Sequence, residues 1–251
     1  MKKNLKRREF LKKAGVAGAA AVGASTLAAP AIAGGHQEWI ICSAFGKAGL
    51  LGQAIQAFGD NINRYSDKLK IKVYHSGELV PGLESLDAVR SGAAQASYGA
   101  PYYWTNVSDA IEFVATCPFG MNAMEQNAWC YYGGGIEEAD KIYNALGLKF
   151  LPMGNTGNQM GGWFNKEINT PADYQGLKMR MPGLGGRTIE KLGATPVLLA
   201  GPDVLPSLSS GAVDAAEWIC PAADLGAGLY QAAKYYYCLL YTSPSPRDGI
   251  G

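Results

Sequence analysis

Arg180 is the residue whose type and position most directly suggest binding chemistry. It alternates with apolar neighbours in LKMRM (177–181), which predicts that its side chain points to one face of a strand. A guanidinium on a sheet face can hold a carboxylate through two parallel hydrogen bonds. A surface arginine whose apolar stem lies along the protein is the commoner role. The strand pattern alone leaves both roles open.

Glu217 is a second candidate, because it follows the apolar pair Ala215-Ala216 and precedes Trp218 and Ile219. A buried carboxylate without a partner is costly, so we expect a cation beside it. The glycine-rich run GNTGNQMGGW (154–163) adds a loop whose backbone amides can approach a ligand closely. These three segments predict a locally built site for a small anion.

Histidine, cysteine and nucleotide chemistry find little support in the sequence. Only two histidines, His36 and His75, are present, too few for a His-based triad or a His-rich zinc site to be assembled easily. PGLGG (182–186) lacks the glycine spacing of a nucleotide-binding loop. The five cysteines contain no CxxC pair and are Cys42, Cys117, Cys130, Cys220 and Cys238. One disulfide among the first four and simple buried thiols both remain open.

Apolar runs alternate with helical patterns along the chain. Strands are predicted at 38–42, 70–74, 94–99, 148–154, 177–181 and 195–200. Helices are predicted at 50–62, 83–90, 125–146 and 186–192, and a short one opens at Thr170 with Pro171 at its first position. This alternation predicts an α/β fold with mainly parallel sheets.

Two stretches resemble each other, LDAVRSGAAQA (86–96) and LPSLSSGAVDA (205–215), which lie 119 positions apart. Ordinary helix-stop chemistry in a chain rich in glycine and alanine would also produce them. Read as equivalent units, they predict two similar lobes, 34–156 and 157–237, that form a hinged clamshell. Residues 98–103 and 217–221 would then follow corresponding strands, at the sheet edge where α/β proteins bind ligands.

The N-terminal residues predict an export signal. Residues 1–33 combine basic residues, the pair Arg7-Arg8, an Ala/Gly-rich stretch and a small-residue site ending at Ala33, which indicates a twin-arginine signal peptide and a periplasmic protein. Its removal changes the balance of Lys+Arg to Asp+Glu from 22 against 21 to 15 against 20. An acidic mature protein argues against nucleic acid as a partner.

Longer motifs carry a family resemblance that runs from about residue 39 to residue 237. GNTGNQMGGWFNKEI, GLKMRMPGLGG, KLGATPV and SSGAVDAAEWI, followed by Asp224 and KYYY (234–237), resemble the solute-binding proteins of tripartite ATP-independent periplasmic (TRAP) transporters. Upstream, GELVPGLESLDAVRSG and the pair Tyr102-Tyr103 fit the same branch. That branch binds 2-oxo or 2-hydroxy monocarboxylates together with a metal ion.

The resemblance implies a role for each matching residue. Arg180 would pair with the substrate carboxylate, while Gln159, Glu217 and the Trp218 carbonyl would hold a bridging Na⁺ or Ca²⁺ ion, for which oxygen ligands are suited. Tyr102 and Tyr103 would close the pocket from the other lobe, although bare aromatics are equally compatible with a core role. The implied partners are a small carboxylate ligand and the TRAP membrane permease; a homodimer stays open.

Departures from the family pattern leave the ligand's identity open. Residues 220–223 read CPAA where the family usually has Gly-Pro-Tyr-Asn, and residues 200–203 read AGPD where Pro-Gly-Gly-Glu is more usual. Family members also continue past KYYY, whereas this chain continues into CLLYTSPSPRDGIG (238–251). We therefore expect a C-terminally truncated member, with an incomplete second lobe and a non-native or disordered tail.

Two other classes of function compete with solute binding. An exported, cofactor-dependent oxidoreductase is the stronger one, since twin-arginine signals often serve proteins that fold around cofactors before export. A structural or adhesive periplasmic protein is disfavoured by the polar residues gathered at strand ends. The sequence therefore predicts a binding protein and no enzyme.

Overall fold

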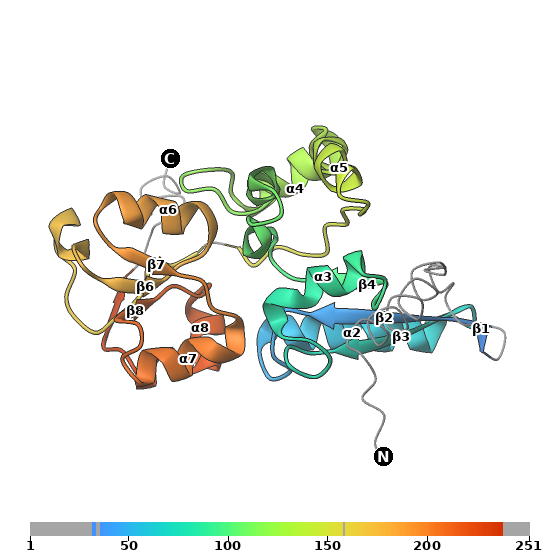
Figure 1. The fold of residues 1–251 in the computed structure, drawn as a ribbon, viewed down its shortest axis with the longest axis horizontal. Coiled ribbons are helices and arrows are strands. Elements are labelled where there is room, and N and C mark those ends of the chain that lie inside the picture. Colours follow the sequence, from blue (N-terminus) through green and yellow to red (C-terminus); the bar gives the residue numbers. More distant parts are fainter. Residues whose placement is uncertain (1–31, 34–35, 158, 238–251) are drawn as a thin grey trace, which may run out of the picture.

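The computed structural model describes residues 32–33, 36–157 and 159–237. The predicted signal peptide, apart from residues 32 and 33, lies outside the described residues, as do Cys238 and the predicted tail. Figure 1 shows two sheets at opposite ends of the molecule, with a group of helices above the region between them. Within the described residues, no helix combines the length and apolarity needed to cross a bilayer.

The first sheet is built around β2 (His36–Ser43). Its neighbours are β1 (Ile32–Ala33), β3 (Leu69–Tyr74) and β4 (Ala96–Tyr98). β3 and β4 run parallel to β2, and β1 pairs with the start of β2 in antiparallel orientation. The strand–helix–strand order with a parallel pairing confirms the predicted α/β unit.

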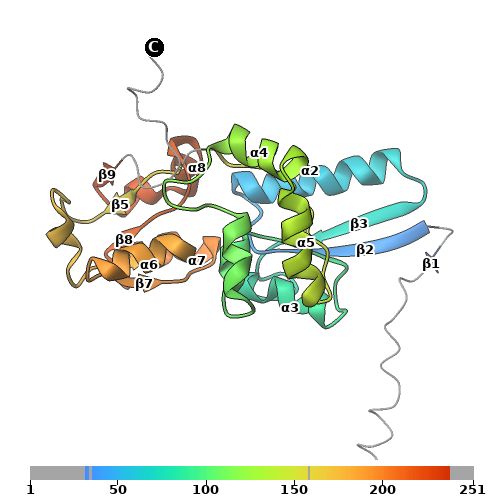
Figure 2. The same ribbon diagram turned by 90° about the horizontal axis from the view of Figure 1, so that it is seen from above.

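Helices cover both faces of this sheet because β2 is apolar on both sides. Ile41 of β2 packs with Ile55 of α2 (Leu50–Tyr65) and Ile71 of β3. The next residue, Cys42, faces the other way and packs with Ala88 of α3 (Ser85–Arg90). Figure 2 shows α2 and α3 on opposite sides of β2 and β3.

The second sheet has the strand order β7-β6-β8-β5-β9. Its strands are β5 (Gly162–Phe164), β6 (Lys178–Arg180), β7 (Thr195–Val197), β8 (Ala215–Ala216) and β9 (Tyr235–Tyr237). β6 runs parallel to both β7 and β8, whereas β5 pairs antiparallel with β8 and β9. The sheet is therefore mixed, with its parallel strands on the side that carries Arg180.

Two helices enclose the second sheet. Ile189 of α6 (Gly183–Lys191) packs with Phe164 and Met179, and Val204 of α7 (Gly201–Ser209) packs with Ala216 on the opposite face. Figure 1 shows α6 above and α7 below these strands. We call residues 36–157 the first half of the chain and residues 159–237 the second half. The remaining elements of the second half are η4 (Pro171–Tyr174), α8 (Pro221–Ala227) and η5 (Leu229–Gln231).

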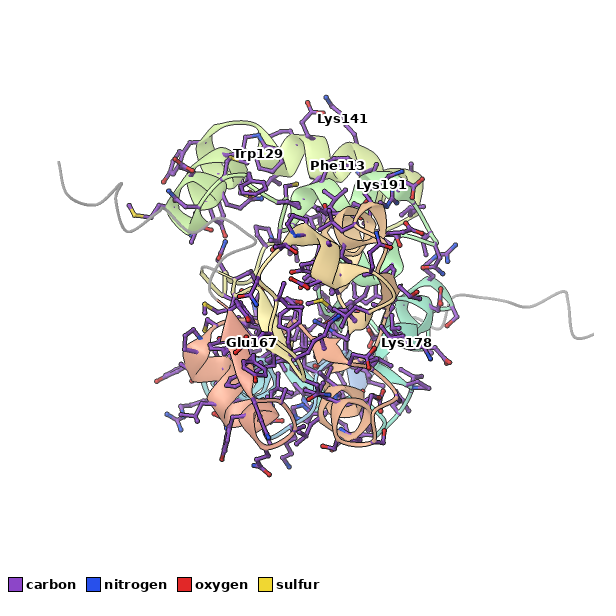
Figure 3. All side chains as sticks on the ribbon, turned by 90° about the vertical axis from the view of Figure 1, so that its left-hand side faces the viewer. Phe113, Trp129, Lys141, Glu167, Lys178 and Lys191 are labelled. Carbon is purple, nitrogen blue, oxygen red and sulfur yellow. The ribbon has the colours of Figure 1, made fainter. Side chains whose placement is uncertain are left out.

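A group of helices lies between the sheets in sequence. It consists of η2 (Pro101–Trp104), η3 (Asp109–Val114), α4 (Ala123–Tyr132) and α5 (Gly135–Ala145), and η1 (Gly82–Glu84) precedes α3. Figure 3 labels Trp129 of α4, Lys141 of α5 and Lys191 of α6 in the upper part of its view, and Figure 1 shows these three helices along the top of the molecule. Ile111, Val114, Ala139 and Tyr143 form a core with the end of the first sheet, and Trp218 packs against it.

Two predicted elements take a different form. The single helix expected at 125–146 is two helices, because Gly133 ends α4 and Gly134 adopts a left-handed conformation with φ +86°. The strand expected at 148–154 pairs with no other strand of the described residues. Phe150 packs against the Tyr143 ring instead, and Pro152 has no N–H to donate to a sheet.

Candidate functional site

Arg180 lies at the carboxyl end of β6 with only 1% of its surface exposed. Its Nη1 donates to the Glu217 carboxylate Oε2 at 2.7 Å and to the Glu217 backbone oxygen at 2.6 Å. Its Nη2 donates to the Tyr103 hydroxyl at 3.3 Å. The buried Nε has no hydrogen-bond partner, so one donor of the guanidinium is unused. This burial contradicts the interpretation of Arg180 as a surface arginine.

Glu217 follows β8 directly, and its side chain is 7% exposed. Burial raises the pKa of Glu217 to about 8, because the loss of hydration outweighs the lowering by Arg180, and Asp224 raises it further. The cation expected beside Glu217 is thus present as Arg180. Near neutral pH, and in the absence of another cation, a proton on Glu217 leaves the pair with a net positive charge.

Gln159 brings an amide to the other side of the Glu217 carboxylate. With its amide oriented to satisfy its neighbours, Gln159 donates to Glu217 Oε1 at 2.7 Å and to the Trp218 carbonyl oxygen at 3.2 Å, and its oxygen accepts from the Thr156 hydroxyl at 3.1 Å. Turned by half a rotation, the amide would present its oxygen beside the Glu217 and Trp218 oxygens, an arrangement that suits a cation among them. The same side chains therefore suit either a cation or a hydrogen-bonded, cation-free state.

Tyrosine and tryptophan rings surround the arginine. Tyr103 is 3% exposed and reaches Arg180 from η2, an element of the first half of the chain. The Arg180 guanidinium lies 5.0 Å from the centre of the Trp218 ring. That ring is also 6.4 Å from Phe45, which follows β2. The two halves of the chain therefore meet around Arg180, as the predicted equivalence of residues 98–103 and 217–221 requires.

A cavity of about 270 Å³, including its open mouth, adjoins this cluster. It is lined by Tyr102, Thr116, Gln159, Pro182, Gly185 and Glu217. Arg180 lies behind this lining and meets it through Glu217. Thr116 and Pro182 were not singled out from the sequence, because a threonine and a proline in irregular segments carry no periodic signal.

Gly183 allows the two halves to approach each other beside the cavity. Its φ is +59°, and a Cβ atom there would lie 2.7 Å from Tyr102 Cβ. Any other residue would meet both the steric cost of positive φ and the tyrosine side chain. The contact with Tyr102 thus explains the first glycine of PGLGG, and no bound nucleotide is needed to account for it.

An ionic contact also joins the halves. Arg187 of α6 donates to Asp109 of η3 at 2.7 Å and lies 3.1 Å from the Glu112 carboxylate. Glu112 is 1% exposed, and burial raises its pKa. These residues border a wider cleft of about 540 Å³ next to Tyr102.

Cysteine and metal-cluster chemistry are absent from the described part of the chain. Cys42, Cys117, Cys130 and Cys220 form no disulfide, which settles the open alternative in favour of free thiols. No group of three or more His, Cys, Asp or Glu side chains gathers among the described residues.

The family model for bacterial extracellular solute-binding proteins of family 7 matches residues 45–239. A monocarboxylate 2-oxoacid-binding periplasmic protein from Nostoc sp. is 45% identical over 179 residues, which are 71% of this chain and 49% of the relative. The chain thus spans about half the length of the curated relative it matches.

Solved structures of TRAP periplasmic solute-binding proteins are also similar. One from Pseudoalteromonas atlantica, with bound sodium and pyruvate, has a TM-score of 0.79 and 38% identity, covering 82% of this chain and 63% of that chain. One from Colwellia psychrerythraea, with bound calcium and pyruvate, has a TM-score of 0.78 and 39% identity over the same shares. One from Bordetella bronchiseptica, a dimer with copurified calcium and picolinate, has a TM-score of 0.77 and 33% identity, covering 80% of this chain and 60% of that chain.

Proposed function

Because this chain belongs to family 7 of the bacterial extracellular solute-binding proteins, we propose that it is the solute-binding subunit of a TRAP transporter. It captures a small 2-oxo or 2-hydroxy monocarboxylate together with Na⁺ or Ca²⁺. The family binds and transports solutes, so the oxidoreductase alternative is wrong and the expectation of a non-enzyme is confirmed. The chain covers 63% of each of the two pyruvate-bound structures, so the transport activity of the whole protein is also part of what we propose.

The observation that carries the proposal is the convergence of Arg180, Glu217 and Gln159. A buried guanidinium with an unused N–H lies next to the Glu217 carboxylate, and that carboxylate and the Trp218 carbonyl oxygen both lie within 3.2 Å of the Gln159 amide. A guanidinium suits a carboxylate, and carboxylate, amide and carbonyl oxygens suit a hard cation. This donor set fits the ions bound by the relatives from P. atlantica and C. psychrerythraea.

In the proposed site, Gln159, Glu217 and the Trp218 carbonyl would hold the cation, and Arg180 would pair with the substrate carboxylate. The ion supplies the positive charge that lets an anionic substrate lie next to an ionised Glu217. Without the ion, the raised pKa of Glu217 keeps its carboxyl group protonated at neutral pH, which removes the same repulsion. The site therefore exchanges a proton for a cation when it loads.

Tyr102 and Tyr103 would close the site from the first lobe. We assign residues 34–156 to this lobe and residues 157–237 to the second. The direct bond from Arg180 to Tyr103 makes the arginine a sensor of closure, because hinge opening would break it.

Export and assembly complete the proposal. The pair Arg7-Arg8 supports the twin-arginine route, and the family supports delivery of the ligand to a membrane permease. A homodimer is included only because the B. bronchiseptica relative is a dimer.

A thermal-shift panel tests this function directly. The chain is heated with pyruvate, lactate, 2-oxobutyrate or a longer 2-oxo acid, each with and without Ca²⁺ or Na⁺. Propionate, which lacks the 2-oxygen, is the matched control. We expect short 2-oxo or 2-hydroxy acids to raise the melting temperature in the presence of a cation, and propionate to have little effect, since mass action stabilises only the species that binds. No shift with any acid would overturn the proposal.

A further inference from the structure

Asp224 and the tyrosines of KYYY belong to the motifs singled out from the sequence, and the proposed site leaves them without a role. Asp224 lies in the first turn of α8 and is fully buried, with 0% of its surface exposed. It does not line the cavity beside Glu217. A buried carboxylate is expensive unless it is hydrogen-bonded, so its contacts indicate why it is there.

Three donors from three segments satisfy Asp224. Its Oδ1 accepts from the Ile219 backbone N–H at 2.9 Å. Its Oδ2 accepts from Trp163 Nε1 of β5 at 3.1 Å and from the Tyr236 hydroxyl of β9 at 2.9 Å. The Trp163 and Tyr236 rings stack with centroids 4.1 Å apart. The carboxylate is therefore held rigidly, and its one backbone partner adjoins the site.

The bond to Ile219 controls the direction of the Trp218 carbonyl. The Trp218 C=O and the Ile219 N–H belong to one peptide group, which is planar and trans, so the two bonds point in opposite directions. With the N–H fixed on Asp224, the carbonyl oxygen points toward Gln159 and lies 3.2 Å from its side-chain amide. Rotation of this peptide would remove the carbonyl from the cluster of oxygens.

The charge of Asp224 acts through the same peptide group. A hydrogen bond to a carboxylate is stronger than one to a neutral acceptor, and it polarises the peptide so that its carbonyl oxygen becomes a better ligand. Partners of metal ligands act in this way in many proteins, and their loss typically lowers metal affinity by about 10- to 100-fold.

We propose that Asp224 is a positioning residue for the cation site, which directs the Trp218 carbonyl at the ion through the Ile219 N–H. This inference rests on the proposed function, because it requires that the oxygens of Gln159, Glu217 and Trp218 hold a cation. The proposal also gives Trp163 and Tyr236 a role, because their hydrogen bonds fix the Asp224 carboxylate, which in turn fixes the peptide group between Trp218 and Ile219.

Calcium titration by calorimetry, without any carboxylate ligand, tests the inference in three variants of the chain. Asp224→Ala removes the acceptor, and we expect it to lose about 10- to 100-fold in calcium affinity. Asp224→Asn keeps an oxygen that can accept from Ile219 but removes the charge, and we expect it to lose less calcium affinity than Asp224→Ala. Tyr236→Phe removes one donor to Oδ2 while leaving Trp163 and the Ile219 bond, and it should stay within about threefold of the unmodified chain.

The outcomes separate this inference from the function on which it rests. A folded Asp224→Ala variant that binds calcium as tightly as the unmodified chain overturns the positioning role alone, and so does an equal loss in the Ala and Asn variants. An unmodified chain that binds no calcium or sodium overturns the cation site and this inference together. If Asp224→Ala does not fold, Asp224→Leu, which fills the space, takes its place. Circular dichroism of each variant separates lost affinity from lost structure.

Discussion

Two arginines of the second half reach toward the first half, and they do so in opposite environments. Arg180 is 1% exposed and bonds Glu217 and Tyr103, whereas the Arg187 side chain is 51% exposed and bonds Asp109. Both contacts join the halves of the chain. Only the first leaves a buried donor without a partner.

Burial determines what each contact can do. The Arg187–Asp109 pair is exposed and hydrated, and such a pair contributes about 0–1 kcal/mol, so it is suited to a weak, reversible contact between the halves. Arg187 also lies 3.1 Å from the buried Glu112 carboxylate. A buried ion pair adds little stability compared with apolar packing of the same volume, so stability alone does not explain Arg180. In the proposed function, a ligand that accepts from the unpartnered Nε–H of Arg180 explains it, and Arg187 adds a second contact between the halves.

Loss of Arg180 should give the largest effect. In Arg180→Ala, we expect pyruvate affinity to fall by on the order of 100-fold or more, because truncating one member of a buried charge pair costs 2–5 kcal/mol in binding. Calorimetry measures the change, and Arg180→Lys tests whether the forked geometry matters in addition to the charge. Pyruvate affinity within threefold of the unmodified chain would remove Arg180 from the site.

Loss of Glu217 should make binding both weak and insensitive to cations. In Glu217→Ala, we expect about a tenfold or greater loss of pyruvate affinity, with no further response to added calcium, because a charged cation ligand is gone. Glu167→Ala removes an exposed carboxylate, labelled in Figure 3, and is the matched control. If the pyruvate affinity of Glu217→Ala still rises when calcium is added, the ion does not bind at Glu217.

The stability of the cation-free chain should depend on pH through Glu217. Its pKa is raised from 4.5 to about 8, so the folded state holds its proton more tightly than the unfolded state. The resulting stabilisation is complete below about pH 4.5 and is lost as the pH rises to about 8. Urea unfolding at several pH values measures this slope.

Glu217→Gln identifies the source of that slope. Burial also raises the pKa of Glu112 and of Asp224, so part of the slope should survive in this variant. The free energy of unfolding should change less with pH in Glu217→Gln than in the unmodified chain, and the difference between the two slopes is the contribution of Glu217. An identical slope in both proteins would contradict the raised pKa.

Loss of Arg187 should give the smallest effect. In Arg187→Ala, we expect pyruvate affinity to change by less than about fivefold, the range of an exposed ion pair, and to change less still at high salt. Calorimetry at low and high ionic strength checks this. A loss as large as that of Arg180→Ala would erase the distinction between the two arginines.

Much of the site was predictable because its main residues lie where periodicity is informative. Arg180 lies within an alternating strand and Glu217 directly after one, so their burial and proximity follow from the parallel pairing of β6 and β8. Gln159 came only from the family resemblance, because an amide in a glycine-rich loop has no periodic signal.

The elements and contacts that sequence reasoning missed have local causes. The break between α4 and α5 depends on a pair of glycines, Gly133 and Gly134, within an otherwise continuous helical pattern. The contact of Arg187 with Asp109 joins residues 78 positions apart on different halves of the chain, and no local pattern reports such a distance. The role proposed for Asp224 depends on the direction of one peptide group, which no sequence pattern specifies.

The most direct test of the central claim is a calorimetric titration of pyruvate into the chain with and without saturating calcium. Because the cation on Glu217 and the carboxylate on Arg180 are neighbours of opposite charge in this account, each should tighten the binding of the other by the same factor. We predict a clear gain in pyruvate affinity when calcium is present, accompanied by release of the Glu217 proton below about pH 8. Equal pyruvate affinity under both conditions would contradict the account.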